Sequence, residues 1–304
     1  MNIKNVFISG AGALGLMYAS YLSKGMGKEN VYLIADENRV EKYKSLKFYV
    51  NDDKHEFNFI SDKNTSLKAD LIILSVKFTG IHEALKSLKN ILKDDTVFIS
   101  VMNGIESENV IKEYYGDKHL LYCEVHGMDT VKEGNKIYLS KPGVVCFGSK
   151  DNKITEDVKS VEEVLKKSNL PYEIPTDIMH KMWSKLMLND AVNQVCAVFE
   201  TGYGGIQKEG KAKDMVMETM REVSKVAKAE GIILTEDEIN DWMDLMDTLN
   251  PENMPSLRQD TKAKRKTEVE LFAGTIRKLG KKHDIPTPFN DYLYDKIREI
   301  ENNY

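Results

Sequence analysis

The first half of the chain alternates short apolar runs with stretches of helical spacing. The apolar runs are residues 6–8, 31–34, 71–76 and 97–101. The stretches of helical spacing are residues 13–23, a segment near 80–92 and residues 105–115. Continuous apolar runs are typical of parallel strands that helices bury on both faces. The alternation therefore predicts a parallel β-sheet with helices on both sides.

Residues 120–149 have a different pattern, in which β-rich apolar runs are separated by turn signals. Glu133-Gly134-Asn135 is one such signal, and Lys141-Pro142-Gly143 is another. Apolar runs joined by short glycine-containing turns are typical of hairpins. We expect hairpin-like strands that extend the edge of the parallel sheet.

The second half of the chain is predicted to be helical throughout. A connector punctuated by prolines occupies residues 170–175, and glycines and prolines mark the later breaks. The predicted helices are 176–199, 207–231, 236–248, 257–281 and 288–302. The chain is therefore predicted to be an α/β protein with a parallel-sheet domain over 1–172 and an all-helical domain over 173–304.

Composition excludes several classes of protein. The 304 residues include 43 Lys+Arg and 48 Asp+Glu, so the net charge of -5 gives no basic excess for nucleic acid or an anionic membrane. No apolar run approaches the roughly 18–20 residues of a membrane span, and the N-terminus lacks the pattern of a signal peptide. Three scattered cysteines predict neither a disulfide framework nor a metal site. We expect a cytoplasmic protein.

A glycine-rich pattern, G-x-G-x-x-G, follows the first predicted strand and opens the first predicted helix. Its residues are Gly10, Ala11, Gly12, Ala13, Leu14 and Gly15. The first glycine permits a tight turn, the second lets the backbone approach a pyrophosphate, and the third lets the helix pack on the strand. The helix N-terminus then presents N–H groups to the phosphates. In this position the pattern predicts dinucleotide binding by a Rossmann-type domain rather than a plain glycine-rich turn.

The choice of dinucleotide is left open by the residues after the second strand. An acid about 20 residues past the glycines usually binds the ribose 2′-hydroxyl of NAD, whereas an arginine nearby accommodates the 2′-phosphate of NADP. Asp36 therefore favours NAD and Arg39 favours NADP. The alternative is that both are solvent-exposed charged residues of a turn and bind no cofactor.

Two polar residues follow later strands of the predicted sheet. Lys77 and Asn103 fall at carboxyl ends of parallel strands, where ligands bind in open α/β sheets. Lys77 is suited to a phosphate or ribose, and Asn103 to a ribose or substrate group. The alternatives are an exposed lysine and an ordinary Asn-Gly turn.

A polar stripe runs along the first predicted helix of the second half. Lys185, Asn189 and Asn193 are spaced i, i+4 and i+8 and so share one slowly drifting face. Their neighbours Trp183 and Leu186 are apolar, which indicates a well-buried helix. Such a stripe can orient a small polar substrate and supply a proton. The alternative is an ordinary exposed helix face without a functional role.

Further polar residues lie near the end of the chain. Ser256 and Gln259 have the spacing of a capping box at the start of a predicted long helix. Glu268 lies on the same predicted helix, where a solvated acid is the plain alternative to a functional one. No nucleophile triad, P-loop or metal cluster is evident.

In this order the motifs resemble the ketopantoate reductase family (2-dehydropantoate 2-reductases). The resemblance rests on the glycine loop, the strand-end lysine, the Asn-Gly, W-x-K-L-x-x-N-x-x-x-N from Trp183 and S-x-x-x-D…T-E from Ser256, and it covers essentially the whole chain. It implies NAD(P)H-dependent reduction of 2-dehydropantoate to pantoate in pantothenate biosynthesis, with hydride added to the keto carbon.

The resemblance assigns roles residue by residue. The family's general acid falls on Lys185, and its cleft glutamate falls on Glu268, which is expected to hold the ammonium of that lysine. Its substrate-binding residues fall on Asn103, Asn189, Asn193 and Ser256. Its cofactor-binding residues, besides the glycine loop, fall on Lys77, Asn103 and Glu268. A small 2-oxo acid is its expected substrate. Apart from the resemblance, the long helices of the second half are a candidate face for a second copy of the chain.

Three departures from the family pattern leave the cofactor and substrate open. Asp36 stands where a basic residue is common, so NADP(H) is expected from the family and NAD(H) from this residue. Gln194 replaces a common proline, and Tyr203 replaces a further polar contact. The alternatives are a reductase of another 2-oxo acid and a non-catalytic sensor of the nicotinamide cofactor.

Overall fold

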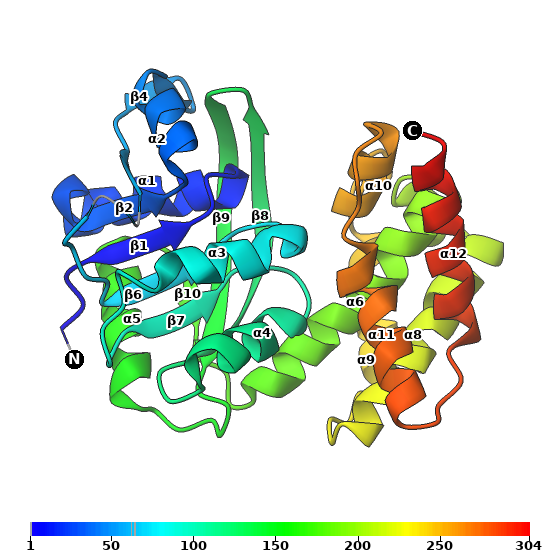
Figure 1. Cartoon of the computed structure of the whole chain (residues 1–304). Helices are drawn as coiled ribbons and strands as arrows, with labels where there is room; N and C mark the ends of the chain where they lie inside the picture. Colours follow the sequence, from blue (N-terminus) through cyan, green and yellow to red (C-terminus); the bar gives the residue numbers. More distant parts are fainter. Residues whose placement is uncertain (1, 62, 64) are drawn as a thin grey trace. The chain divides into compact units, whose positions relative to one another are not determined.

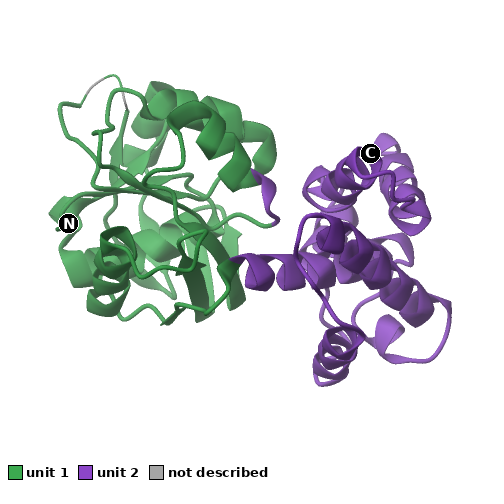
Figure 2. Cartoon of the chain, turned by 90° about the horizontal axis from the view of Figure 1, so that it is seen from below, with its two compact units in different colours: residues 1–103, 107–178 green, residues 104–106, 179–304 purple. Residues whose placement is uncertain are grey.

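The computed structural model describes residues 2–61, 63 and 65–304, and it divides into two compact units (Figures 1 and 2). Unit 1 comprises residues 1–103 and 107–178, and unit 2 comprises 104–106 and 179–304. The division falls after Ile178 rather than after residue 172. The reason is that Tyr172 and Glu173 form a strand that pairs with unit 1, so the connector belongs to that unit.

A five-stranded sheet of parallel strands forms the centre of unit 1, as the apolar runs predict. Its order is β5-β2-β1-β6-β7. The strands are β1 (Val6–Ser9), β2 (Val31–Ile34), β5 (Asn58–Ile60), β6 (Leu71–Leu74) and β7 (Val97–Ser100). The strand β1 is buried on both faces, because Val6 and Ile8 pack into one hydrophobic cluster and Phe7 into the other. The predicted fold class is confirmed.

Helices cover the two faces of this sheet. They are α1 (Ala13–Met26), α2 (Glu37–Lys44), α3 (Ile81–Leu88), α4 (Glu106–Tyr115) and α5 (Glu156–Lys167), with the 3-10 turns η1 (Lys28–Asn30) and η3 (Phe78–Gly80). Residues of α1 and α5 belong to the cluster with Val6, and residues of α3 and α4 to the cluster with Phe7. The carboxyl ends of β1 and β2 lead directly into the starts of α1 and α2.

A second sheet in unit 1 corrects the expectation for residues 120–149. The predicted hairpin is present as β8 (Tyr122–Glu133) and β9 (Lys136–Gly148). Only its lead-in extends the parallel sheet, where Leu120 pairs in parallel with Phe98 of β7. The hairpin itself joins β3 (Phe48–Val50), β4 (Asp53–His55) and β10 (Tyr172–Glu173) in the order β10-β9-β3-β4. The inward face of β8 packs on α1, where the Thr130 hydroxyl lies 3.2 Å from the Met17 sulfur. Covering α1 buries the apolar face of the hairpin, which explains the separate sheet (Figure 1).

Every described element of unit 2 is helical. The elements are α6 (Ile178–Val198, whose first residue belongs to unit 1), α7 (Gly204–Gln207), α8 (Lys211–Ala229), α9 (Glu236–Asp247), α10 (Ser256–Lys262), η4 (Val269–Leu271), α11 (Ala273–Lys282) and α12 (Pro288–Asn302). The single helix expected over 257–281 is wrong. The chain leaves the helix after Lys262, and Lys264 adopts a left-handed backbone with φ of 52°. None of the described helices has the length and apolar character needed to cross a membrane.

Candidate functional site

Two glycines of the glycine-rich loop are required by close packing. A Cβ atom on Gly10 would lie 2.3 Å from the carbonyl oxygen of Ser75, and Gly10 has a φ of 118°. A Cβ atom on Gly15 would lie 1.9 Å from the carbonyl oxygen of Gly10. Gly12 differs, because a Cβ atom there would have no neighbour within 4 Å. The loop is therefore closely packed at Gly10 and Gly15 and has open space beside Gly12.

The start of α1 has the features of an anion site. The N-cap residue is Gly12, which has no side chain to accept a hydrogen bond from the first turn. This arrangement leaves the positive end of a 14-residue helix facing the open side of the loop. The residues present therefore fit the pyrophosphate of a dinucleotide, as the motif predicts.

Asp36 and Arg39 interact with one another at the start of α2. Asp36 is the N-cap residue, and its Oδ1 accepts a hydrogen bond of 2.9 Å from the backbone N–H of Arg39. Its Oδ2 lies 3.2 Å from Nε of Arg39. Both side chains are more than half exposed. Asp36, which favours NAD, is thus already paired with Arg39, which favours NADP.

Lys77 and Asn103 follow two adjacent strands, β6 and β7, which pair in parallel with Leu74 opposite Ser100. Lys77 is exposed, and its carbonyl oxygen accepts a hydrogen bond of 2.8 Å from the backbone of the next turn. Asn103 is half-buried. The parallel pairing brings both residues to the carboxyl edge of the sheet.

The polar stripe on α6 is present and becomes more buried along the helix. Lys185 and Asn189 are half-buried, and Asn193 is only 5% exposed. Their apolar neighbours, including Trp183 and Leu186, are almost completely buried. The stripe is therefore not an ordinary solvated helix face.

Asn193 and Ser256, which the resemblance assigns to substrate, lie in contact. Oδ1 of Asn193 accepts hydrogen bonds of 3.0 Å from the Ser256 hydroxyl and 3.2 Å from the backbone N–H of Leu257. The predicted capping box is wrong, since Ser256 is already the first residue of α10 and Gln259 donates instead to the carbonyl oxygen of Met254. Asn193 supplies the cap from another helix, which no local spacing could have predicted.

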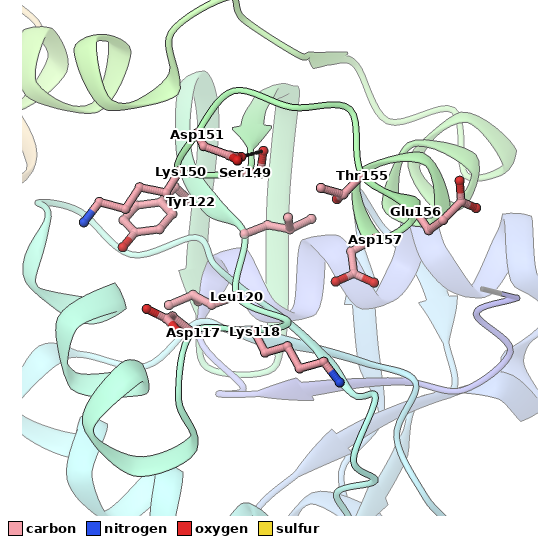
Figure 3. Close-up of a pocket in the computed structure, with 11 residues that line it drawn as sticks. Asp117, Lys118, Leu120, Tyr122, Ser149, Lys150, Asp151, Thr155, Glu156 and Asp157 are labelled. Atoms are coloured by element: carbon pink, nitrogen blue, oxygen red, sulfur yellow. Dashed lines mark hydrogen bonds between the residues drawn. The ribbon is translucent and has the colours of Figure 1, made fainter.

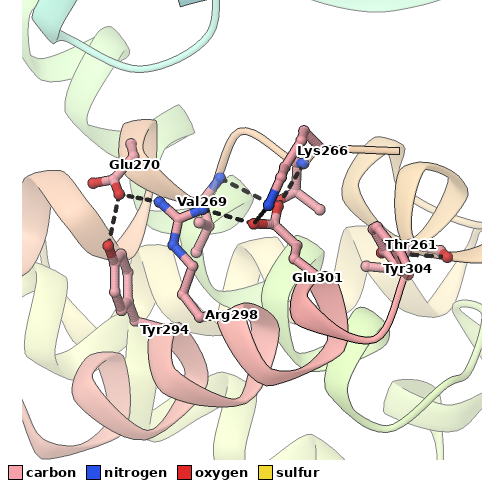
Figure 4. A network of polar contacts seen from close by, with 9 residues as sticks. Thr261, Lys266, Val269, Glu270, Tyr294, Arg298, Glu301 and Tyr304 are labelled. Atoms are coloured by element: carbon pink, nitrogen blue, oxygen red, sulfur yellow. Dashed lines mark hydrogen bonds and ion pairs between the residues drawn. The ribbon is translucent and has the colours of Figure 1, made fainter. Parts of the chain in front are cut away.

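Glu268 lies outside regular helix, in the segment that leads to η4, and not on the long helix expected from the sequence. The preceding residue, Thr267, anchors this segment. Its backbone N–H and its hydroxyl both donate to Oε1 of Glu301 at 2.7 Å. The Glu301 side chain is fully buried and also pairs with Arg298 and Lys266 (Figure 4). Glu301 was missed by sequence reasoning, because it reads as one more acid in a charged terminal helix.

The departure at Gln194 belongs to the core of unit 2. Gln194 is fully buried, and its amide donates to the backbone carbonyl and to Oδ1 of Asp190 at 2.8 and 2.9 Å. Burial, together with the negative charge of Glu222, raises the pKa of Asp190 well above its ordinary value. Gln194 is therefore hydrogen-bonded to another core side chain. Tyr203, the site of the other departure in unit 2, is half-buried.

A hollow of about 510 Å³ lies elsewhere in unit 1, beside the start of β8 and the start of α5 (Figure 3). Acids and lysines alternate along its lining, including Asp117, Lys118, Lys150 and Asp157. It contains none of the residues that the sequence singled out. The mixed charges indicate no particular ligand. The candidate residues therefore remain, within unit 1, those at the loop and strand ends and, within unit 2, those on α6 and α10.

Comparison with known proteins identifies the family. Residues 6–152 match the family model described as ketopantoate reductase PanE/ApbA, and residues 177–301 match that of its C-terminal part. Curated relatives named 2-dehydropantoate 2-reductase come from Streptococcus pyogenes serotype M6, at 26% identity with 97% of each chain covered, and from Aquifex aeolicus, at 27% identity with 98% of this chain and 97% of the relative covered.

Solved structures share the fold at low sequence identity. D-mandelate dehydrogenase with NADH and anilino(oxo)acetate has a TM-score of 0.87 at 24% identity, and a PanE/ApbA family ketopantoate reductase from Ralstonia eutropha JMP134 has 0.85 at 24%. Each comparison covers 98% of this chain and 99% of the other. Since the two family models together span most of both units, the chain belongs to the ketopantoate reductase family of NAD(P)-dependent oxidoreductases.

Proposed function

We propose that this enzyme reduces 2-dehydropantoate to pantoate with NADPH as the hydride donor. The observation that carries the proposal is the polar set on α6 and α10, where the stripe ends in the contact between Asn193 and Ser256. The family models and the names of the curated relatives support the same substrate.

Lys185 is proposed as the general acid. When bound, the reduced nicotinamide would supply a hydride to the keto carbon, which would leave negative charge on the carbonyl oxygen. The Lys185 ammonium donates a proton to that oxygen, so the product is a neutral hydroxyl. Glu268 is proposed to hold the ammonium in position. Thr267 and Glu301 support this role, because they fix the backbone beside Glu268.

The contact between Asn193 and Ser256 suggests how the substrate is oriented. The Ser256 hydroxyl donates to Asn193, so its lone pairs remain as acceptors for the distal hydroxyl of the substrate. The amide nitrogen of Asn193 and that of Asn189 are donors suited to the carboxylate. Binding both ends of a short molecule fixes the carbonyl group between them, which lowers the entropic part of the barrier.

NADPH rather than NADH is proposed because Asp36 is engaged by Arg39. A carboxylate that already accepts a backbone hydrogen bond and forms an ion pair with a guanidinium is less available to a ribose hydroxyl. The glycine loop is proposed to hold the pyrophosphate, with Lys77 and Asn103 contacting the cofactor from the strand ends. Asn103 is also proposed to contact the substrate.

A second candidate keeps the reaction and changes the 2-oxo acid. The fold is shared with a protein named D-mandelate dehydrogenase, so the fold alone does not select 2-dehydropantoate. The substrate is therefore a matter for direct comparison.

The test measures loss of reduced-nicotinamide absorbance with purified enzyme. The panel pairs NADPH and NADH with 2-dehydropantoate, a branched aliphatic 2-oxo acid lacking the distal hydroxyl, and an aromatic 2-oxo acid. We expect the highest kcat/KM for 2-dehydropantoate with NADPH. Higher kcat/KM for another acid replaces the proposed substrate, and no turnover of any acid by a cofactor-binding enzyme contradicts the proposal.

The role of Lys185 is tested by Lys185→Ala in the same assay. Loss of a general acid lowers kcat by about 10²–10⁴-fold, while NADPH affinity measured by calorimetry is expected to stay unchanged. Lys208→Ala, at an exposed lysine of unit 2, is the matched control. Near-native turnover of Lys185→Ala removes this residue from the acid role.

We also propose a homodimer. A ketopantoate reductase from Staphylococcus aureus that shares the fold, with a TM-score of 0.84 at 18% identity and with 98% of this chain and 99% of that chain covered, is described as dimeric. Light scattering distinguishes the 34.7 kDa chain from a particle of about twice that mass. A mass equal to that of one chain contradicts the dimer.

A further inference from the structure

A lysine from the second sheet of unit 1 reaches the glycine-rich loop. Nζ of Lys132, on β8, donates a hydrogen bond of 2.7 Å to the backbone carbonyl oxygen of Ala11. The two residues are 121 positions apart in the chain. Lys132 is no part of the glycine motif, and neither the motif nor the proposed function uses it.

The register of the hairpin places Lys132 there. Along β8 the residues from His126 onward alternate between half-buried and exposed, so Thr130 and Lys132 face inward while Val131 faces solvent. Thr130 contacts Met17 on α1. Two residues further along the strand, Lys132 arrives at the loop that precedes this helix. The position is thus set by packing of the hairpin on α1.

The surroundings of Lys132 are short of negative charge. Its ammonium lies 5.9 Å from the centre of the Tyr43 ring on α2. Burial, and then the positive charge of Lys42, lower the pKa of Lys132. Over residues 2–61, 63 and 65–304, no carboxylate forms an ion pair with it, and its hydrogen-bond acceptor is a neutral carbonyl group. A half-buried cation in this setting gains stability when an anion binds beside it.

The position of Lys132 between the loop and α2 indicates which anion fits. The pyrophosphate of a dinucleotide is served by the N-terminus of α1. The 2′-position of the adenosine ribose lies instead toward the end of the second strand, where α2 begins. There the Asp36 carboxylate is paired with Arg39. Lys42, in the last turn of α2, adds a positive charge near Lys132. The side of the loop toward α2 is therefore suited to a phosphate.

We propose that Lys132 binds the 2′-phosphate of NADPH and is a specificity-determining residue of this enzyme. The inference rests on the proposed function in that it requires the dinucleotide at the glycine loop, and it adds a cofactor contact from the hairpin. The hydrogen bond to Ala11 holds the ammonium in place before the cofactor arrives, and the phosphate then completes its partners.

The test is calorimetric binding of two probes, adenosine 2′,5′-bisphosphate and 5′-AMP, which differ by the 2′-phosphate. We expect Lys132→Gln to weaken binding of the bisphosphate by about tenfold or more, the effect of one charge-assisted hydrogen bond. Binding of 5′-AMP should change by less than about twofold. Lys132→Arg should restore most of the bisphosphate affinity, because it keeps the charge. Lys141→Gln, at an exposed lysine of the same hairpin, is the control.

Two results overturn the inference. Equal weakening of both probes by Lys132→Gln assigns the residue to loop structure, and unchanged binding of the bisphosphate removes it from the cofactor site. Thermal unfolding of the free proteins shows whether each variant is folded. Failure of the proposed function gives a different result. A wild-type enzyme that binds neither NADPH nor NADH contradicts the proposal that the enzyme uses a nicotinamide cofactor. A wild-type enzyme that binds NADH as tightly as NADPH contradicts only the proposed preference for NADPH.

Discussion

At the scale of the residue, single side chains serve two elements at once. Asn193 belongs to the stripe on α6 and also caps α10 through Leu257. Asp190, on the next face of the same helix, lies at a buried hydrogen-bonded cluster with Gln194 and Asn290. Among the described residues, neither Oδ2 of Asp190 nor Oδ1 of Asn290, both buried, has a hydrogen-bond partner. A proton retained on Asp190 supplies a donor there, in agreement with its raised pKa.

Asp190 predicts a pH-dependent stability. Its pKa is raised in the folded state by burial and by Glu222, whereas an unfolded aspartate has a pKa of about 3.9. Above that value the unfolded chain releases a proton that the folded chain retains, so this residue's contribution falls by about 1.4 kcal/mol per pH unit until the folded pKa is reached. Asp190→Asn stays neutral and removes the fall. Urea unfolding at pH 5 and pH 8 should show a smaller loss for this variant than for the wild type.

The control for this prediction is Asp94→Asn, at an exposed acid of unit 1. It should keep the wild-type difference between the two pH values. Identical pH dependence in the wild type and in Asp190→Asn would show that Asp190 does not hold its proton in the folded state.

At the scale of the element, the irregular segment between α10 and α11 matters most. Sequence periodicity alone predicts one helix here, but Thr267 is tied to Glu301 on α12 and the chain turns out of the helix. The tie places Glu268 in the turn before η4. A long-range hydrogen bond has therefore overridden local helical propensity at a residue that the family resemblance assigns to the site.

Glu301→Gln is expected to loosen this segment. The new amide NH₂ would face the Arg298 guanidinium or the Thr267 donors, so buried donors would lose their acceptor. The expected cost is about 1–3 kcal/mol in the free energy of unfolding. If Glu301 positions Glu268, kcat should also fall while NADPH affinity stays unchanged. Glu299→Gln, at an exposed acid of the same helix, should change stability by less than about 0.5 kcal/mol.

The two readouts separate the roles of Glu301. Loss of stability with the kcat of the Glu299→Gln control makes Glu301 structural only. An unchanged free energy of unfolding contradicts the argument from burial. A fully buried carboxylate with three partners is expected to lower the stability of the protein when it loses its charge.

At the scale of the whole molecule, the proposed cofactor residues and the proposed proton donor belong to different units. The glycine loop, Lys77 and Lys132 lie in unit 1, and Lys185 and Glu268 lie in unit 2. NADPH is expected to bind mainly through unit 1, so it should stabilise the chain without substrate. At a free NADPH concentration 100 times Kd the gain is about 2.7 kcal/mol, seen as a rise in Tm.

Gly12→Glu tests this stabilisation without disturbing the fold. Gly12 has an extended backbone, and a side chain there meets open space. The variant should therefore keep the Tm of the free protein, yet lose the NADPH-dependent rise because its carboxylate repels the phosphates. Gly10→Ala is the contrasting variant, since its Cβ would clash with Ser75 and should lower the Tm of the free protein. A full NADPH shift in Gly12→Glu places the cofactor elsewhere.

The parallel sheet, the glycine loop and the stripe on α6 could all be predicted from the sequence, because each depends on local periodicity and spacing. Apolar runs at 6–8 and 71–76 suffice to predict buried strands, and a period of four suffices to align Lys185 with Asn189. The second sheet could not be predicted, because its strands at 48–50 and 53–55 are too short to show a pattern. The same holds for the cap from Asn193, the turn at Thr267 and the hydrogen bond from Lys132 to Ala11. These rest on contacts between residues 34 to 121 positions apart. Such contacts form only when packing brings distant segments together, and no local pattern encodes them.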